Sequence, residues 1–221
     1  MRRTPELLLF DLDGTLVDSA PDLAGAANDL RALHGLLPLD LSLLRPMVGS
    51  GARGMVGVAF GIAPPDPRFD ALRDAFLDGY ARRLLRHTQV FDAMARVLDD
   101  LDARGHRWGI VTNKAMRFTA PIVDGLGLSA RAVVVIAGDT TPHAKPHPAP
   151  LLEAARRAGV APERCAYVGD DLRDVQAGKA AGMTTVAAAW GYLGQGEPVQ
   201  AWAADAVLDS PDQLLQWLDL P

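Results

Sequence analysis

An apolar segment near the start of the chain ends in two closely spaced carboxylates. Residues 7–10 (LLLF) are continuously apolar, and Asp11 and Asp13 follow at once within the run DLDGT. A short apolar run that ends in turn-forming residues is typical of a buried parallel strand. In open α/β sheets, ligand sites form beyond the carboxyl ends of strands. Two carboxylates placed there repel each other unless a cation or a shared proton relieves them, so the run indicates chemistry. The plain alternative is a strand end capped by turn-forming Asp and Gly.

The chain after this motif divides into a helical block and a region of alternating helices and strands. Residues 17–86 show no strand pattern and predict four helices, at 21–34, 41–47, 52–60 and 69–85. Four further helices each precede a strand, and the predicted pairs are 92–103 with 107–111, 118–126 with 133–136, 149–158 with 166–168, and 171–181 with 184–188. Segments 206–208 and 212–218 follow. This alternation predicts an α/β fold with a doubly wound, Rossmann-like parallel sheet.

The position of the helical block predicts a two-part organisation. The block begins directly after the DLDGT run, so it should sit above the edge of the sheet that carries the carboxylates. We therefore predict a catalytic core made of residues 1–16 and 88–221, and a helical cap domain made of residues 17–87.

Composition narrows the class of protein. The net charge is -5 and there is no basic stripe, which argues against nucleic acid as a partner. The apolar runs are far shorter than a membrane span, and the N-terminus lacks the pattern of a signal peptide. The single cysteine, Cys165, cannot form an internal disulfide, and we expect it to pack at the start of a buried strand. A cytoplasmic protein fits these features.

Polar residues follow two further predicted strands or the loops after them. Thr112 and Asn113 end the strand at 107–111 and suit a phosphate oxyanion, although both also cap helices. Lys145 lies between prolines and histidines in the run HAKPHPAP. Only three of the 22 basic residues are lysines, Lys114, Lys145 and Lys179, so each one raises a functional question. A fixed cation at Lys145 would neutralise negative charge in a transition state, whereas a surface lysine is the plain alternative.

A third acidic group follows the strand at 166–168. Asp170, Asp171 and Asp174 occupy the strand end and the first turn of the next helix. Carboxylates there can ligate a hard cation, but they also stabilise a helix N-terminus without any metal. The four motifs occur in a fixed order, each at or shortly after a strand end, and this combination indicates one shared site.

These motifs, in this order, resemble those of the haloacid dehalogenase-like hydrolase superfamily, in its branch of phosphatases that use an aspartate nucleophile. The resemblance covers nearly the whole chain and implies that the helical block is a type 1 cap. The chain is most similar to phosphoglycolate phosphatase-like enzymes. Within them, the runs SGAR (50–53), VTNK (111–114) and VGDDLRD (168–174) resemble bacterial N-acetylmuramic acid 6-phosphate phosphatases.

The resemblance implies a role for each acidic residue. Asp11 would be the nucleophile that accepts the phosphoryl group, and Asp13 the general acid and base. Mg²⁺ would be held by the side chains of Asp11 and Asp170 and by the backbone carbonyl of Asp13. Asp174 and Asp171 would orient waters on the metal.

The resemblance also implies contacts with substrate, a small phosphorylated metabolite. Thr112 and Asn113 would hold phosphoryl oxygens, and Lys145 would bridge the nucleophile and the phosphate. Arg53, on the predicted cap, is our candidate for the leaving group, because a guanidinium can grip a carboxylate; a solvated arginine is the alternative. Phosphoglycolate and N-acetylmuramic acid 6-phosphate both carry a carboxylate, so Arg53 does not separate them. A monomer and a homodimer both stay open.

Single residues argue for or against the other reactions that relatives of this family catalyse. Dehalogenases lack an acid at the place of Asp13, and phosphonate-cleaving relatives need a cap lysine, whereas residues 17–87 contain none. A phosphosugar mutase of the β-phosphoglucomutase type shares these motifs and stays open. A non-catalytic module that accepts phosphate on aspartate is disfavoured, because it needs neither a cap nor the acid at Asp13.

Overall fold

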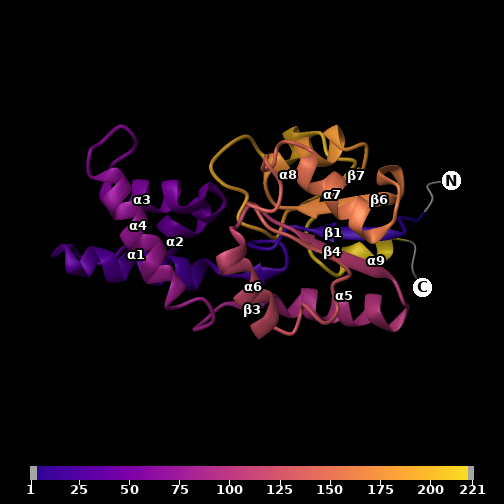
Figure 1. Ribbon diagram of the computed structural model, residues 1–221, viewed down its shortest axis with the longest axis horizontal. Coiled ribbons are helices and arrows are strands. Elements are labelled where there is room, and N and C mark those ends of the chain that lie inside the picture. The colour runs from indigo at the N-terminus through magenta and orange to yellow at the C-terminus, as the bar shows by residue number, and fades with distance from the viewer. Residues whose placement is uncertain (1–3, 219–221) are drawn as a thin grey trace.

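A six-stranded, fully parallel sheet forms the centre of the larger part of the molecule, on the right in Figure 1. The structure is a computed structural model, and it describes residues 4–218; the outermost residues of the predicted core, 1–3 and 219–221, lie outside that range. The strand order is β5-β4-β1-β6-β7-β8. The strands are β1 (Leu7–Phe10), β4 (Arg107–Val111), β5 (Val135–Ile136), β6 (Cys165–Gly169), β7 (Thr184–Ala188) and β8 (Ala206–Leu208). The predicted doubly wound α/β fold is confirmed.

Helices cover both faces of this sheet because the side chains of each strand alternate between them. On β1, Leu8 and Phe10 pack in the same cluster as α5 and α9, whereas Leu7 and Leu9 pack with α7. The core helices are α5 (Asp92–Ala103), α6 (Met116–Gly125), α7 (Ala149–Ala158), α8 (Leu172–Ala180) and α9 (Gln213–Trp217), with short 3₁₀ helices η2 (Pro162–Arg164) and η3 (Val199–Trp202). Cys165 is buried at the start of β6, as expected.

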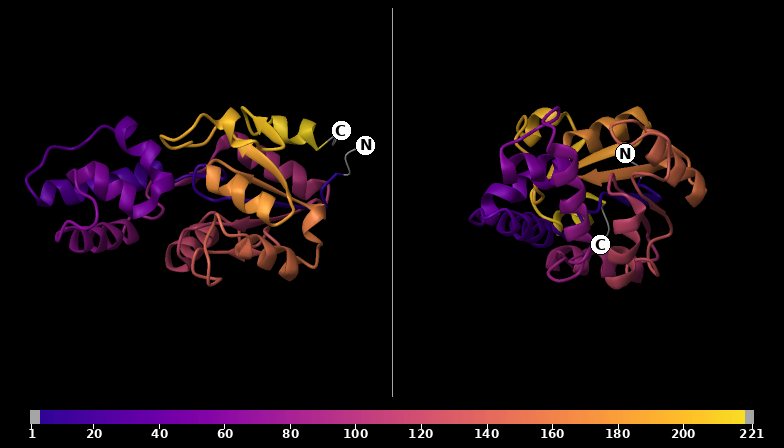
Figure 2. Two further views of the ribbon diagram at one scale, coloured as in Figure 1. Left: turned by 90° about the horizontal axis from the view of Figure 1, so that it is seen from above. Right: turned by 60° about the vertical axis from the view of Figure 1, so that its left-hand side comes forward.

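The helical block lies beyond one end of the sheet and is joined to it by a narrow connection (Figure 2). It contains α1 (Ala20–Leu33), α2 (Leu41–Leu44), the 3₁₀ helix η1 (Arg45–Ser50), α3 (Gly51–Phe60) and α4 (Phe69–Ala81). The predicted helix at 41–47 is therefore split. Pro46 lies at the start of η1, where it removes a backbone donor that a continuous α-helix would use.

The expectation that residues 17–86 contain no strand is wrong. Val17–Asp18 (β2) pairs antiparallel with Gln89–Val90 (β3), and this ribbon forms the connection between block and sheet. Two-residue strands are too short to produce a visible alternation in sequence. The buried carboxylate of Asp22 also ties the connection together, because its Oδ2 accepts hydrogen bonds from the backbone N–H groups of His87 and Thr88.

The helices of residues 4–218 include none that is both long enough and apolar enough to span a bilayer.

Candidate active site

A cavity of about 380 Å³ lies between the carboxyl ends of the strands and the helical block. The loops after β1, β4, β5 and β6 form its floor, and η1, α3 and α4 contribute its outer wall. The lining from the core includes all but one of the site residues expected from the sequence, namely Asp11, Asp13, Thr112, Asn113, Lys145, Asp170, Asp171 and Asp174. The folding of the sheet therefore brings the four motifs to one cavity, as the topology of parallel strands requires.

Three carboxylates crowd together on the floor of the cavity. Asp11, Asp170 and Asp174 each offer an oxygen, and these atoms lie within 4.8 Å of one another. Burial, and then the neighbouring Asp11, raise the pKa of Asp170 well above its ordinary value. Thr15 Oγ1 donates to Asp170 Oδ1 at 2.9 Å, and the backbone N–H of Tyr192 donates to Oδ2 at 2.8 Å. Carboxylate oxygens are the ligands that Mg²⁺ prefers, and here three carboxylates lie close together.

The glycine of the DLDGT run permits this crowding. Gly14 has φ +84°, and a Cβ atom there would lie 2.2 Å from Asp170 Oδ2. Only glycine combines this left-handed backbone with so close an approach to a neighbouring side chain. The fold therefore requires the glycine of the DLDGT run, in addition to any chemical role of its aspartates.

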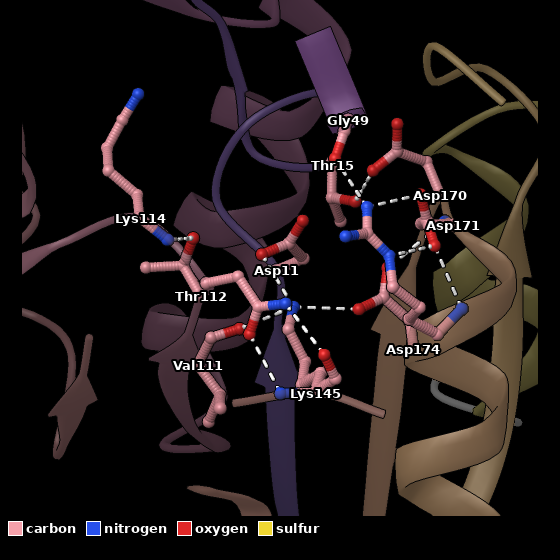
Figure 3. Close-up of polar contacts among 12 residues, drawn as sticks. Asp11, Thr15, Gly49, Val111, Thr112, Lys114, Lys145, Asp170, Asp171 and Asp174 are labelled. Atoms are coloured by element: carbon pink, nitrogen blue, oxygen red, sulfur yellow. Dashed lines mark hydrogen bonds and ion pairs between the residues drawn. The ribbon is translucent and has the colours of Figure 1, made fainter. Parts of the chain in front are cut away.

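Lys145 supplies positive charge beneath the carboxylates (Figure 3). Its Nζ lies 2.9 Å from Asp11 Oδ1 and 2.7 Å from Asp174 Oδ1, and its side chain is only 3% exposed. Burial acts to lower the pKa of Lys145, but the attraction of Asp11 and Asp174 outweighs it and raises that pKa. The same interactions act on Asp174: burial raises its pKa to about 6, although Lys145 opposes the shift. Lys145 is therefore a buried cation that pairs with two carboxylates of the acidic cluster.

Asn113 holds the Lys145 loop in place. Its side-chain amide donates to the backbone carbonyl of Lys145 and its Oδ1 accepts from the backbone N–H of Lys145, both at 2.9 Å. The predicted contact of Asn113 with phosphoryl oxygens would thus fall to its main chain. Thr112 is buried, lines the cavity, and accepts a hydrogen bond from the backbone N–H of Lys114 at 3.2 Å.

Asp13 lies within a second polar group, which includes a residue that the sequence reasoning did not assign. Lys114 Nζ lies 2.9 Å from Asp13 Oδ1 and 2.8 Å from the hydroxyl of Tyr80, which belongs to α4 in the helical block. Ser19 Oγ also donates to Asp13 Oδ1. In the view of Figure 3, Lys114 lies on the opposite side of Asp11 from Asp170 and Asp171. The sequence signals for Lys114 are the rarity of lysine in the chain and its place in the VTNK run, and neither assigns it a role.

Asp171 is engaged at the start of α8. Its side chain accepts from the backbone N–H of Arg173 at 2.9 Å, and Asp174 accepts from the N–H of Asp171, so the two aspartates form a reciprocal cap. The guanidinium of Arg173 pairs with Asp171 and also donates to the carbonyl of Gly49 in η1. Burial acts to raise the pKa of Asp171, but the hydrogen bonds from Arg173 bring it below its usual value. Arg173 therefore joins the core to the helical block.

Arg53 is the one expected site residue that the cavity does not include. It is exposed on α3 and is absent from the lining. Arg117, in the first turn of α6, lines the cavity instead. Arg117 follows the VTNK run (111–114) of the resemblance by three residues.

The chain matches known hydrolases in both sequence and fold. The family model for haloacid dehalogenase-like hydrolases matches residues 5–182. An N-acetylmuramic acid 6-phosphate phosphatase from Pseudomonas aeruginosa is 40% identical, over 96% of this chain and 94% of its own. A phosphoglycolate phosphatase from Xanthomonas campestris pv. campestris is 46% identical, over 96% of each chain. A crystal structure from Haemophilus somnus 129PT, described as a predicted phosphoglycolate phosphatase, has a TM-score of 0.85 at 27% identity, covering 98% of this chain and 99% of that one. The chain belongs to the haloacid dehalogenase-like hydrolases and is a phosphoric monoester hydrolase of that family.

Proposed function

We propose that this protein is a Mg²⁺-dependent phosphatase that hydrolyses a small carboxylated phosphate ester through an aspartyl-phosphate on Asp11. The observation that carries the proposal is the convergence of Asp11, Asp170 and Asp174 with the buried cation of Lys145 on the floor of the cavity. Phosphoryl transfer needs an in-line nucleophile and dense positive charge around the phosphoryl oxygens, and this group of residues can provide both.

The residues divide the reaction into two steps. In the first, a carboxylate oxygen of Asp11 attacks phosphorus, the bond from phosphorus to the ester oxygen breaks, and Asp13 gives its proton to the departing oxygen. In the second, Asp13 takes a proton from water as that water attacks the aspartyl-phosphate, which releases phosphate and restores Asp11. General acid and base catalysis of this kind needs a carboxyl group within reach of the leaving oxygen. Asp13 fits because it lines the same cavity as Asp11.

The acidic cluster fits a divalent cation. The side chains of Asp11 and Asp170 and the backbone carbonyl of Asp13 would hold Mg²⁺, and Asp174 and Asp171 would orient its waters. When bound, Mg²⁺ supplies charge that neutralises the phosphoryl oxygens in the transition state. Burial and the neighbouring carboxylates raise the pKa of Asp170. A bound cation would relieve this repulsion and favour the ionised form.

Lys145 and the end of β4 would position the phosphoryl group. Lys145 would bridge the nucleophile and a phosphoryl oxygen, and Thr112 and Asn113 would bind the other oxygens from the side of β4. The Asn113 amide keeps the Lys145 backbone fixed, so the cation needs no rearrangement when substrate arrives.

We propose that the helical block, residues 17–87, is a cap that closes over the bound ester. The polar contacts that hold it against the core include one between Tyr80 and Lys114 and one between Gly49 and Arg173. The cap side of the cavity is apolar, with Leu23, Val48 and Phe76 in the wall. Such a lid excludes water from the reacting phosphate.

The names of the relatives support two substrates, 2-phosphoglycolate and N-acetylmuramic acid 6-phosphate. The cavity lies in the range of about 300–1,000 Å³ that drug-sized ligands occupy, and it therefore has room for more than a glycolate.

The test is phosphate release from both esters, with Mg²⁺ and with a chelator, comparing kcat/KM. We expect turnover that requires the metal. Product analysis separates the rival function, because a phosphosugar mutase would return an isomerised phosphosugar and little free phosphate. The absence of phosphate release from any ester would refute the proposal.

A further inference from the structure

Four cationic side chains line the cavity, and three of them are already bound to carboxylates. Lys145 pairs with Asp11 and Asp174, Lys114 with Asp13, and Arg173 with Asp171. Within residues 4–218, no carboxylate lies within ion-pair distance of the fourth, Arg117. Arg117 is therefore the lining cation whose charge is free to meet an anionic group of a ligand.

Arg117 lies at the outer end of a continuous aromatic wall. Its guanidinium lies 4.5 Å from the centroid of the Phe118 ring, and the Phe118 and Tyr80 rings are 5.5 Å apart. Lys114 Nζ lies 4.7 Å from the Tyr80 centroid at the inner end, where it also contacts Asp13. The wall thus starts beside Asp13 and ends at the exposed Arg117.

This order of groups matches an extended leaving group with a carboxylate at its far end. The leaving oxygen must lie at Asp13, so the body of the leaving group would follow the Tyr80 and Phe118 rings. Two aromatic rings with few polar groups suit an uncharged ring or chain, and a planar guanidinium suits a carboxylate that it can bind with two hydrogen bonds. A carboxylate close to the phosphate would meet Lys114 first.

We propose that Arg117 determines specificity by binding the carboxylate of a leaving group in which that carboxylate is separated from the phosphate by the length of a sugar ring. The inference rests on the proposed phosphatase function and selects between its two substrates. N-acetylmuramic acid 6-phosphate has this form, because its lactyl ether is attached to C3 of the sugar and its phosphate to the oxygen on C6. In 2-phosphoglycolate the carboxylate is too near the phosphate to reach Arg117.

The experiment compares two esters that differ only in the lactyl ether that carries the carboxylate. N-acetylglucosamine 6-phosphate lacks the lactyl ether of N-acetylmuramic acid 6-phosphate and is otherwise the same sugar phosphate. For Arg117→Gln we expect KM for the muramic acid ester to rise about tenfold with little change in kcat, since the lost contact is made equally in the ground state and the transition state. KM for the glucosamine ester should change by less than about twofold. Arg117→Lys should restore part of the loss, and Arg104→Gln, an exposed arginine after α5, is the matched control.

The other possible results overturn either the inference about Arg117 or the proposed function as a whole. Equal losses on both esters would mean that Arg117 supports the structure of α6, and unchanged kinetics would mean that it does not touch substrate; either result overturns the inference and leaves the phosphatase proposal intact. The inference is also overturned, with the phosphatase proposal intact, if Arg53→Gln and not Arg117→Gln loses the preference for the muramic acid ester over the glucosamine ester. Hydrolysis of phosphoglycolate alone by the wild-type protein would have the same meaning. If the wild-type protein releases phosphate from no ester, the proposed function fails and the inference fails with it.

Discussion

Replacing Lys145 by methionine tests how the acidic cluster is held together. Lys145 Nζ lies 2.9 Å from Asp11 Oδ1 and 2.7 Å from Asp174 Oδ1, and both side chains of the second pair are 3% exposed. Methionine keeps most of the side-chain volume and removes the charge. Three carboxylates, Asp11, Asp170 and Asp174, would then share the floor of the cavity without their buried counter-charge.

The size of the loss follows from the burial of the pairs. Removing one partner of a buried ion pair costs about 3–5 kcal/mol, because the remaining charge is left uncompensated. In a chelator we therefore expect Lys145→Met to lower the free energy of unfolding by about that amount. Magnesium should recover part of it, since a ligand at about 100 times its Kd adds about 2.7 kcal/mol to the folded state. Turnover should fall by about 10²–10³-fold, the loss typical of a removed electrostatic contact to the transition state.

Urea denaturation with and without Mg²⁺, together with phosphate release, measures these effects. Lys179→Met is the matched control, because Lys179 is exposed on α8, and we expect it to change stability by less than about 0.5 kcal/mol. A Lys145→Met protein as stable as wild type in the chelator, or one with full turnover, would refute the reasoning.

Two further predictions concern the same cluster. Burial raises the pKa of Asp174 to about 6 from 3.8, so the folded state holds this proton more tightly than the unfolded state does. Metal-free stability should therefore fall between about pH 4 and 6 as pH rises, less so in Asp174→Asn, as measured by urea denaturation in a chelator; an equal pH dependence in both proteins would contradict this. Gly14→Ala should weaken Mg²⁺ binding measured by calorimetry and destabilise the protein, because the new Cβ would lie 2.2 Å from Asp170 Oδ2. Gly35→Ala, with φ +70° and open space around it, should lose only about 1–2 kcal/mol from backbone strain, and equal losses at both glycines would exclude the clash.

The sheet and the cavity floor were predictable because they depend on strong local patterns. Apolar runs such as residues 7–10 end in polar residues, and parallel strands deliver those ends to one edge of the sheet. The convergence of Asp11 and Asp170 follows from this rule, because they follow the ends of β1 and β6, whereas their roles at a metal were implied only by the family resemblance. The ribbon of β2 and β3 left no such pattern, because each strand has only two residues.

Residues that act across the boundary between core and helical block were harder to predict. The contact of Lys114 with Tyr80 joins residues 34 positions apart on separate parts of the fold, and neither sequence run reveals the other. Arg53 and Arg117 look alike as cations near a motif, and only the packing of α3 and α6 places one outside the cavity lining and the other in it. Whether an arginine lines the cavity depends on which face of its helix packs toward the cavity, and the spacing of residues along the chain does not reveal this.

The most direct test of the central claim is to locate the phosphoryl group on the protein during turnover. The reaction with N-acetylmuramic acid 6-phosphate or 2-phosphoglycolate and Mg²⁺ would be quenched in acid, and the peptides analysed by mass spectrometry. We predict a phosphoryl group on Asp11, and no phosphate release by Asp11→Asn. A phosphoryl group on any other residue, or undiminished turnover by Asp11→Asn, would contradict the proposed mechanism.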